Sequence, residues 1–203
     1  MIAFDVETSG PSTQRNSLMA VGIAKYLATG KSVEYLGGLE VHLEVSLENY
    51  EPSTLEFWKT QSCAWEQVKQ NTIPVKEAQR LVVEFLQSAE RDAEKLGANY
   101  RIITDNAWFD PEWINLLLSS PGPGLGLPIR YSQLTGQYFK VTTVIDTNQW
   151  VQALGQCGIP TQIKLFRSTI PHDHTPLNDA RSIAEKYLYL LQRLRQIKKE
   201  SQS

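Results

Sequence analysis

Two acidic residues lie two positions apart near the start of the chain, within the segment IAFDVETSG at positions 2–10. If this segment begins as a strand, Asp5 and Glu7 point to the same face, because successive side chains of a strand alternate. Neighbouring carboxylates repel each other unless a positive charge lies between them, and hard divalent cations prefer oxygen ligands. The pair therefore indicates a cation site, although acidic residues are also common at a solvated strand end.

Two later segments place acidic or histidine side chains where helices are expected to begin. Asp110 follows an expected short strand and precedes Pro111, a residue suited to the first turn of a helix. Asp179 falls in the first turn of the last expected helix, and His174 lies in the loop before it. Each has an ordinary structural alternative: Asp110 could cap its helix, Asp179 could answer the helix dipole, and His174 could be a solvated loop residue.

The elements that must position these residues alternate along the chain. The first three strands predict an antiparallel meander, in which the glycine pair at positions 37–38 marks a bulge or bend. Residues 53–56 have the form of a capping box, and Gly97 lies where a helix C-cap belongs. Later strand–helix units should add parallel strands, so we expect one α/β domain over residues 1–203. The expected strands are 2–6, 18–27, 32–43, 100–104 and 138–145, and the expected helices are 54–71, 75–96, 111–118, 147–154 and 178–197, with a loop at 121–126.

The composition is that of an ordinary soluble globular protein. The chain has 203 residues, of which 41% are hydrophobic and 21% charged, with a net charge of −2. This charge disfavours a broad duplex-binding surface but permits binding of a few nucleotides through metal ions. No apolar run reaches the length of a membrane span, and because the printed sequence leads directly into Asp5 we expect no secretory segment. Cys63 and Cys157 match no metal spacing and are expected to be small core residues, so we expect a soluble protein of the reducing cytoplasm without a membrane partner.

Taken together, the three acidic segments resemble the motifs of the DEDDh 3′→5′ exonucleases. The segments DVETSG, NAWFDPEWINLL and HTPLNDARSIAEKYL are similar to the first, second and third motifs of that superfamily, and VIDT at 144–147 resembles the junction that usually precedes the third. The resemblance runs from Asp5 to about residue 190. It implies a ribonuclease H-like α/β fold, with a mixed central sheet of three antiparallel strands followed by parallel strands, flanked by helices.

A finer resemblance is carried by residues 53–62, STLEFWKTQS. This segment is similar to one in the group that includes phage exodeoxyribonuclease A and a mycobacterial exoribonuclease. The chain departs from many relatives in the second strand, because the segment LMAVG at 18–22 lacks the acidic residue that they carry before the glycine.

The resemblance implies a catalytic centre with two Mg²⁺ or Mn²⁺ ions. Such ions, about 3.5–4 Å apart, activate water and stabilise the leaving oxygen of a phosphodiester. Asp5, Glu7 and Asp179 would bind the ion on the nucleophile side, Asp5 would bridge, and Asp110 would hold the second ion. His174, which has four residues between it and Asp179, would be the general base. The neighbouring His172 receives no role.

Several residues are candidates for binding the substrate. Thr8 and Ser9 follow the first acidic pair and would meet the terminal sugar through hydroxyl or backbone groups. Asn106 belongs to the second motif. Trp58 and Trp108 could stack on bases, although either could be a core residue.

The expected function is a 3′→5′ exonuclease that releases nucleoside 5′-monophosphates from the 3′ end of single-stranded nucleic acid. The sequence leaves the choice between DNA and RNA open, and relatives suggest a homodimer. The alternatives are a catalytically inactive nucleic-acid-binding module of the same fold and an endonuclease. All five catalytic positions are present, which disfavours the first, and the His-x-x-x-x-Asp spacing disfavours the second.

Overall fold

A mixed five-stranded sheet lies at the centre of the part of the chain that the structure, a computed structural model, describes: residues 1–28, 33–119 and 144–202. Its strand order is β3-β2-β1-β4-β5. The first three strands pair antiparallel, whereas β4 pairs parallel with β1 and β5 parallel with β4. A meander followed by parallel strands is the predicted arrangement. The strands are β1 (Ile2–Thr8), β2 (Leu18–Ala28), β3 (Val33–His42), β4 (Ile102–Thr104) and β5 (Val144–Asp146).

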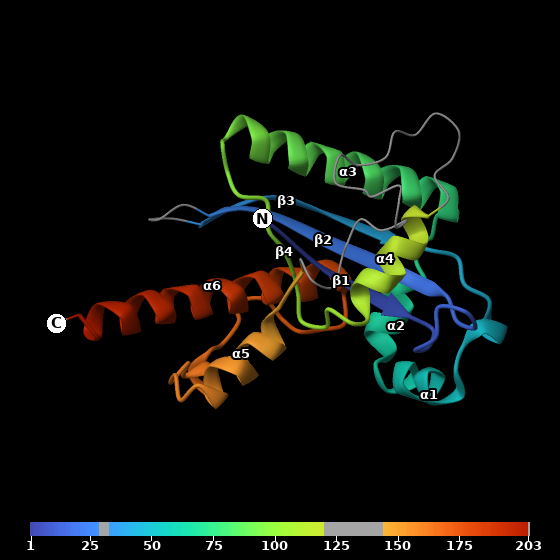
Figure 1. Cartoon of the computed structure of the whole chain (residues 1–203). Helices are drawn as coiled ribbons and strands as arrows, with labels where there is room; N and C mark the ends of the chain where they lie inside the picture. The colour runs from blue at the N-terminus through green and yellow to red at the C-terminus, as the bar shows by residue number, and fades with distance from the viewer. Residues whose placement is uncertain (29–32, 120–143, 203) are drawn as a thin grey trace.

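Helices cover both faces of the sheet (Figure 1). The long helix α3 lies across one face, and the C-terminal helix α6 crosses the other with α5 beside it. The short helices α1 and α2 pack against β2, where Trp58 joins Met19 and Val68 in a small core. The α-helices are α1 (Pro52–Thr60), α2 (Ser62–Val68), α3 (Val75–Lys95), α4 (Asp110–Leu118), α5 (Thr147–Gln156) and α6 (Pro176–Glu200), and 3₁₀ turns span Leu47–Asn49 and Ile163–Leu165.

The alternation of β1 decides which face carries the acidic pair. Ile2, Phe4 and Val6 are buried against α3 and α4 in the larger core. Ala3 points the other way and is buried against α6. Asp5 and Glu7 continue the Ala3 face because side chains two positions apart share a face, so the strand presents both carboxylates on the side that α6 covers.

Gly22 allows the start of α6 to approach the sheet. Gly22 is the partner of Asp5 in the β1–β2 register, and a Cβ atom there would lie only 2.0 Å from the carbonyl carbon of Pro176 and 2.2 Å from the amide nitrogen of Leu177. The Leu177 N–H donates to Glu40 on β3 at 3.0 Å, which fixes the same helix end. The absence of a side chain at position 22 therefore brings the first turn of α6 next to Asp5.

Several sequence predictions are confirmed in detail. The Gly37-Gly38 pair marks a bulge, because the β2–β3 register shifts between Lys25 and Tyr26 and Gly37 has a φ of 121°. Gly97, with a φ of 57°, follows the C-cap of α3 as expected.

Other predictions are wrong. The expected helix over residues 54–71 is two helices, because the backbone at Gln61 leaves helical geometry with a ψ of 45°. The capping box is absent, because α1 begins at Pro52 and Ser53 is already inside it. Cys63 and Cys157 are exposed rather than buried: Ala64 and Val68 form the buried face of α2, which leaves Cys63 off that face, and Cys157 follows the end of α5.

The loop expected at 121–126 lies outside the described residues. Of the strand expected at 138–145, the structure describes only residues 144–145, which belong to β5. Within the described residues, every helix is too short or too polar to cross a bilayer.

Replacing Gly22 with Ala should destabilise the protein by about 1–3 kcal/mol, because the new methyl group overlaps backbone atoms of Pro176 and Leu177 that cannot rotate away. Urea denaturation measures the change. Gly155→Ala is the matched control: its Cβ would meet no atom within 4 Å, so it should be neutral or stabilising by up to about 1 kcal/mol. Equal stability of Gly22→Ala and the parent would contradict this packing account.

Candidate metal centre

Four acidic side chains from three separated segments meet beside the C-terminal end of β1. One carboxylate oxygen from each of Asp5, Glu7 and Asp179 lies within 4.8 Å of the others. Asp5 also belongs to a second group with Asp110, in which the oxygens lie equally close. The residues proposed from the sequence as metal ligands are thus brought together, and Asp5 is common to both groups.

Asp110 is held in place by the strand before it. The Thr104 hydroxyl at the end of β4 donates to Oδ2 of Asp110, and the Asp110 backbone N–H donates to the carbonyl of Asn106 at 3.1 Å. Asp110 is the first residue of α4 and Phe109 occupies the N-cap position. The carboxylate therefore points into the acidic cluster and does not act as a helix cap, which was its structural alternative.

The acidic cluster is electrostatically unfavourable in the absence of a cation. Burial, followed by the charges of Glu7 and Asp110, raises the pKa of Asp5 well above its usual range. Burial and the neighbouring carboxylates likewise raise the pKa of Glu7, and burial raises the pKa of Asp110 to about 8. Burial also raises the pKa of Asp179, against the opposing effect of His172. Divalent cations would restore the ionised forms, and an all-oxygen donor set fits Mg²⁺ or Mn²⁺.

Both loop histidines lie next to Asp179. Nitrogens of His172 and His174 and an oxygen of Asp179 all lie within 4.8 Å of one another. His174 has a φ of 58° and packs edge-on against Phe57, with ring centroids 5.2 Å apart. His172 Nδ1 makes a 3.0 Å hydrogen bond with Asp179 Oδ1. No role was predicted for His172, because residue spacing alone does not show which imidazole reaches the carboxylate of Asp179.

Asp105 is an acidic neighbour that the sequence analysis missed. It directly follows β4, and one of its carboxylate oxygens lies within 4.8 Å of oxygens of Asp5 and Asp110. Its position gave a usable signal, because the C-terminal ends of neighbouring parallel strands are where sites form in α/β sheets. β1 and β4 are such neighbours.

Three of the substrate candidates have side chains committed inside the protein. The Thr8 hydroxyl donates to the carbonyl of Gly10 and the Ser9 hydroxyl to that of Asn49, and Ser9 is fully buried. Trp58 is 0% exposed, and its indole N–H donates to the Thr8 carbonyl at 3.2 Å. The stacking role predicted for Trp58 is therefore wrong: its ring is a core element that supports the end of β1.

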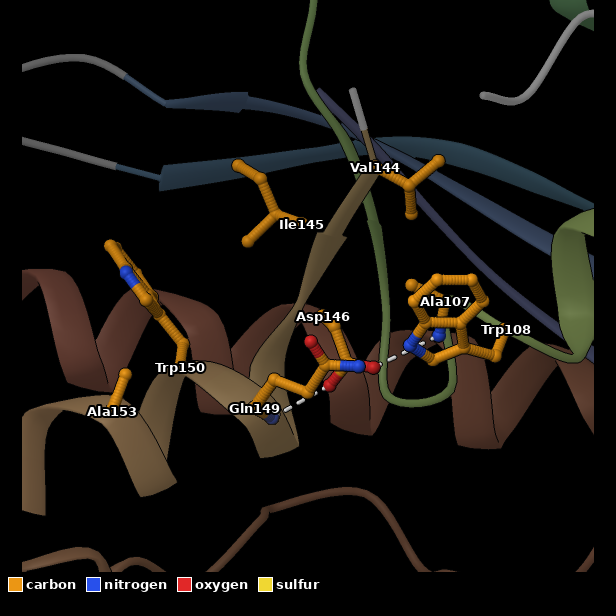
Figure 2. Close-up of a pocket in the computed structure, with 8 residues that line it drawn as sticks. All are labelled: Ala107, Trp108, Val144, Ile145, Asp146, Gln149, Trp150 and Ala153. Atoms are coloured by element: carbon orange, nitrogen blue, oxygen red, sulfur yellow. Dashed lines mark hydrogen bonds between the residues drawn. The ribbon is translucent and has the colours of Figure 1, made fainter. Parts of the chain in front are cut away.

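Trp108 and Asn106 lie at the surface instead. Trp108 is 69% exposed and lines a cavity of about 440 Å³ together with Trp150 and Gln149. Figure 2 shows Trp108 and Trp150 on opposite sides of Asp146. The Asp146 carboxylate accepts hydrogen bonds from the backbone N–H groups of Ala107 and Gln149. Trp108 thus remains available for base stacking.

Comparison by sequence finds no relative: no protein-family model matches the chain, and no curated protein matches it. Solved structures do match. They include S. pombe Pop2p in a form with Mg²⁺ and Mn²⁺ bound, at 13% identity and a TM-score of 0.57, covering 92% of this chain and 80% of that one. They also include the RNase domain of yeast Pop2, at 12% identity and a TM-score of 0.56, covering 95% and 76%.

A third match is the nuclease domain of 3′hExo, a DEDDh family member bound to rAMP, at 13% identity and a TM-score of 0.55, covering 94% of this chain and 90% of that one. The chain has a ribonuclease H-like fold. The predicted fold class is confirmed. The finer resemblance to phage exodeoxyribonuclease A and the mycobacterial exoribonuclease stays a prediction.

The stability of the metal-free protein should depend on pH through the acidic cluster. Between an ordinary Asp pKa of 3.8 and the folded-state value of about 8 for Asp110, the folded protein holds a proton that the unfolded chain has released. The free energy of unfolding should therefore fall as pH rises from about 4 to about 8. Urea denaturation in EDTA at several pH values measures this slope.

The variant Asp110→Asn should have a shallower slope, because one titrating group is gone, and it should be more stable than the parent near pH 8. A parent protein whose metal-free stability rises steadily over this range would contradict the electrostatic description.

Proposed function

We propose that this chain is a metal-dependent 3′→5′ exonuclease of the DEDDh type, acting on single-stranded ends of DNA or RNA and releasing nucleoside 5′-monophosphates. The observation that carries the proposal is the meeting of Asp5, Glu7, Asp110 and Asp179 with His174 at one end of the sheet. Two solved structures of similar fold support the proposal: Pop2p has Mg²⁺ and Mn²⁺ bound, and the nuclease domain of 3′hExo has rAMP bound.

Two divalent ions would fit the two sets of neighbouring carboxylates described above, one ion in each set. Asp5, Glu7 and Asp179 would hold one ion, and Asp5 with Asp110 the other. When bound, such ions activate water and stabilise the oxygen that leaves the phosphorus. The protein contributes the rigid placement: β1 fixes the first two carboxylates, the Thr104 hydroxyl orients Asp110, and the start of α6 fixes Asp179.

His174 would accept a proton from the attacking water. Imidazole titrates near neutral pH and suits this task. Its ring rests on Phe57 and lies close to His172, with ring centroids 4.8 Å apart, so the loop holds it beside the carboxylates. His172 makes its hydrogen bond to Asp179 and competes for the role by proximity.

The substrate would approach across the exposed side chains of Asn106 and Trp108. Trp108 presents a ring face that suits stacking on a base of single-stranded nucleic acid. Because the hydroxyls of Thr8 and Ser9 already donate to backbone carbonyls, the terminal sugar would be met by the backbone of this turn.

The direct test is a time course on 5′-labelled DNA and RNA oligonucleotides of one sequence with Mg²⁺ or Mn²⁺. We expect a ladder that shortens from the 3′ end, stalls on a 3′-phosphate and stops in EDTA. The same experiment reports which sugar is preferred. Cleavage of a 3′-blocked strand at internal positions would identify an endonuclease and contradict the proposal.

Replacing Asp110 with Asn should remove turnover and leave folding intact. Loss of an outer-shell partner alone commonly lowers metal affinity or activity 10- to 100-fold, so loss of a ligand should lower the rate at least about 100-fold. The exposed Glu112, in the first turn of the same helix, gives the control Glu112→Gln, which should cleave at the parental rate. An Asp110→Asn protein as active as the parent would refute the assignment.

The two histidines can be separated by parallel variants. His174→Gln should lower the rate by about 10²–10⁴-fold, the usual contribution of a general base, and should flatten the acidic limb of the pH–rate profile. His172→Gln should lower it much less. If His172→Gln shows the larger loss and the changed profile, then His172 is the base and the assignment from spacing is wrong.

A further inference from the structure

We propose that Asp105 is a fifth acidic ligand of the metal centre, binding the second divalent ion together with Asp5 and Asp110. This inference rests on the proposed function, because it concerns the same two-ion site. It adds a residue that lies outside the three sequence motifs.

The grouping of the oxygens defines two positions for a cation, one on each side of Asp5. Asp5, Glu7 and Asp179 surround one position, and Asp5, Asp105 and Asp110 surround the other, with oxygens in each group within 4.8 Å of one another. With Asp105 included, each position has three carboxylates and shares Asp5 with its neighbour. Without it, the second position would have only two protein ligands.

The ligand count favours inclusion. Hard divalent cations take six or more oxygen ligands, and each protein carboxylate replaces a bound water molecule. A third carboxylate should therefore strengthen binding at the second position, where the motif residues alone supply only Asp5 and Asp110.

The surroundings of Asp105 hold it in place without neutralising it. Its backbone carbonyl accepts a hydrogen bond from the side-chain amide nitrogen of Asn148 at 2.9 Å. The side-chain oxygen of Asn148 in turn accepts a hydrogen bond from the ammonium of Lys186 on α6. Among the ion pairs of the described residues, none joins Lys186 to Asp105. The ammonium is close enough to influence the carboxylate but is hydrogen-bonded elsewhere, so the Asp105 oxygens stay available to a cation.

The test is a calorimetric titration of the whole chain with Mn²⁺ alone, comparing the parent, Asp105→Asn and Asp110→Asn. We expect two sites in the parent. Asp105→Asn should weaken the second site about 10-fold or more and leave the first within about twofold. Asp110→Asn should show the same selective loss. Glu112→Gln removes an equal charge from an exposed position nearby and should leave both sites within about twofold.

The outcomes separate the two proposals. A parent that binds no Mn²⁺ would refute the proposed function and this inference with it. If the parent has two sites and Asp110→Asn weakens the second one, but Asp105→Asn binds Mn²⁺ as Glu112→Gln does, only the role of Asp105 is refuted. Asp105→Asn should fold, because it removes a carboxylate from a repulsive cluster; Asp105→Ser, carried through the same titration, gives a second and independent reading.

Discussion

The mutual repulsion of partly buried carboxylates is the constraint on which the rest of this structure depends. Burial raises the pKa of Asp5, Glu7, Asp110 and Asp179, and neighbouring carboxylates raise it further. A protein gains no stability from such a cluster unless cations occupy it. The proposed cation site would explain this arrangement, and the fold has to supply enough packing elsewhere to hold these side chains together.

That packing comes from close contact between elements far apart in sequence. β1 is the central strand and buries Ile2, Phe4 and Val6 on one face, which forces the acidic pair onto the other. Gly22 then admits the first turn of α6. The second acidic segment arrives by the parallel pairing of β4 with β1. Each approach is fixed by backbone and core contacts, so the carboxylates need no favourable interaction among themselves.

Much of this could be predicted from the sequence, because it depends on short periodic patterns. Alternation in β1 placed Asp5 and Glu7 on one face, and chain order placed the later motifs at neighbouring element ends. The errors concern features that tertiary contacts decide. Trp58 has an aromatic ring that could stack on a base, but the ring is fully buried. The break between α1 and α2 at Gln61, which accompanies this burial, is not marked by any local sequence pattern. The hydrogen bond of His172 and the approach of Asp105 depend on loop geometry, which spacing alone does not encode.

The central claim is that the carboxylates enclose a pair of divalent ions. Crystals grown with Mn²⁺, with diffraction recorded at the manganese absorption edge, test it most directly. We expect two anomalous peaks about 3.5–4 Å apart, with an oxygen of Asp5 between them and His174 close by. The claim would be contradicted by crystals in which manganese does not bind at this cluster and the predicted catalytic side chains point to separate regions. Those side chains are Asp5, Glu7, Asp110, His174 and Asp179.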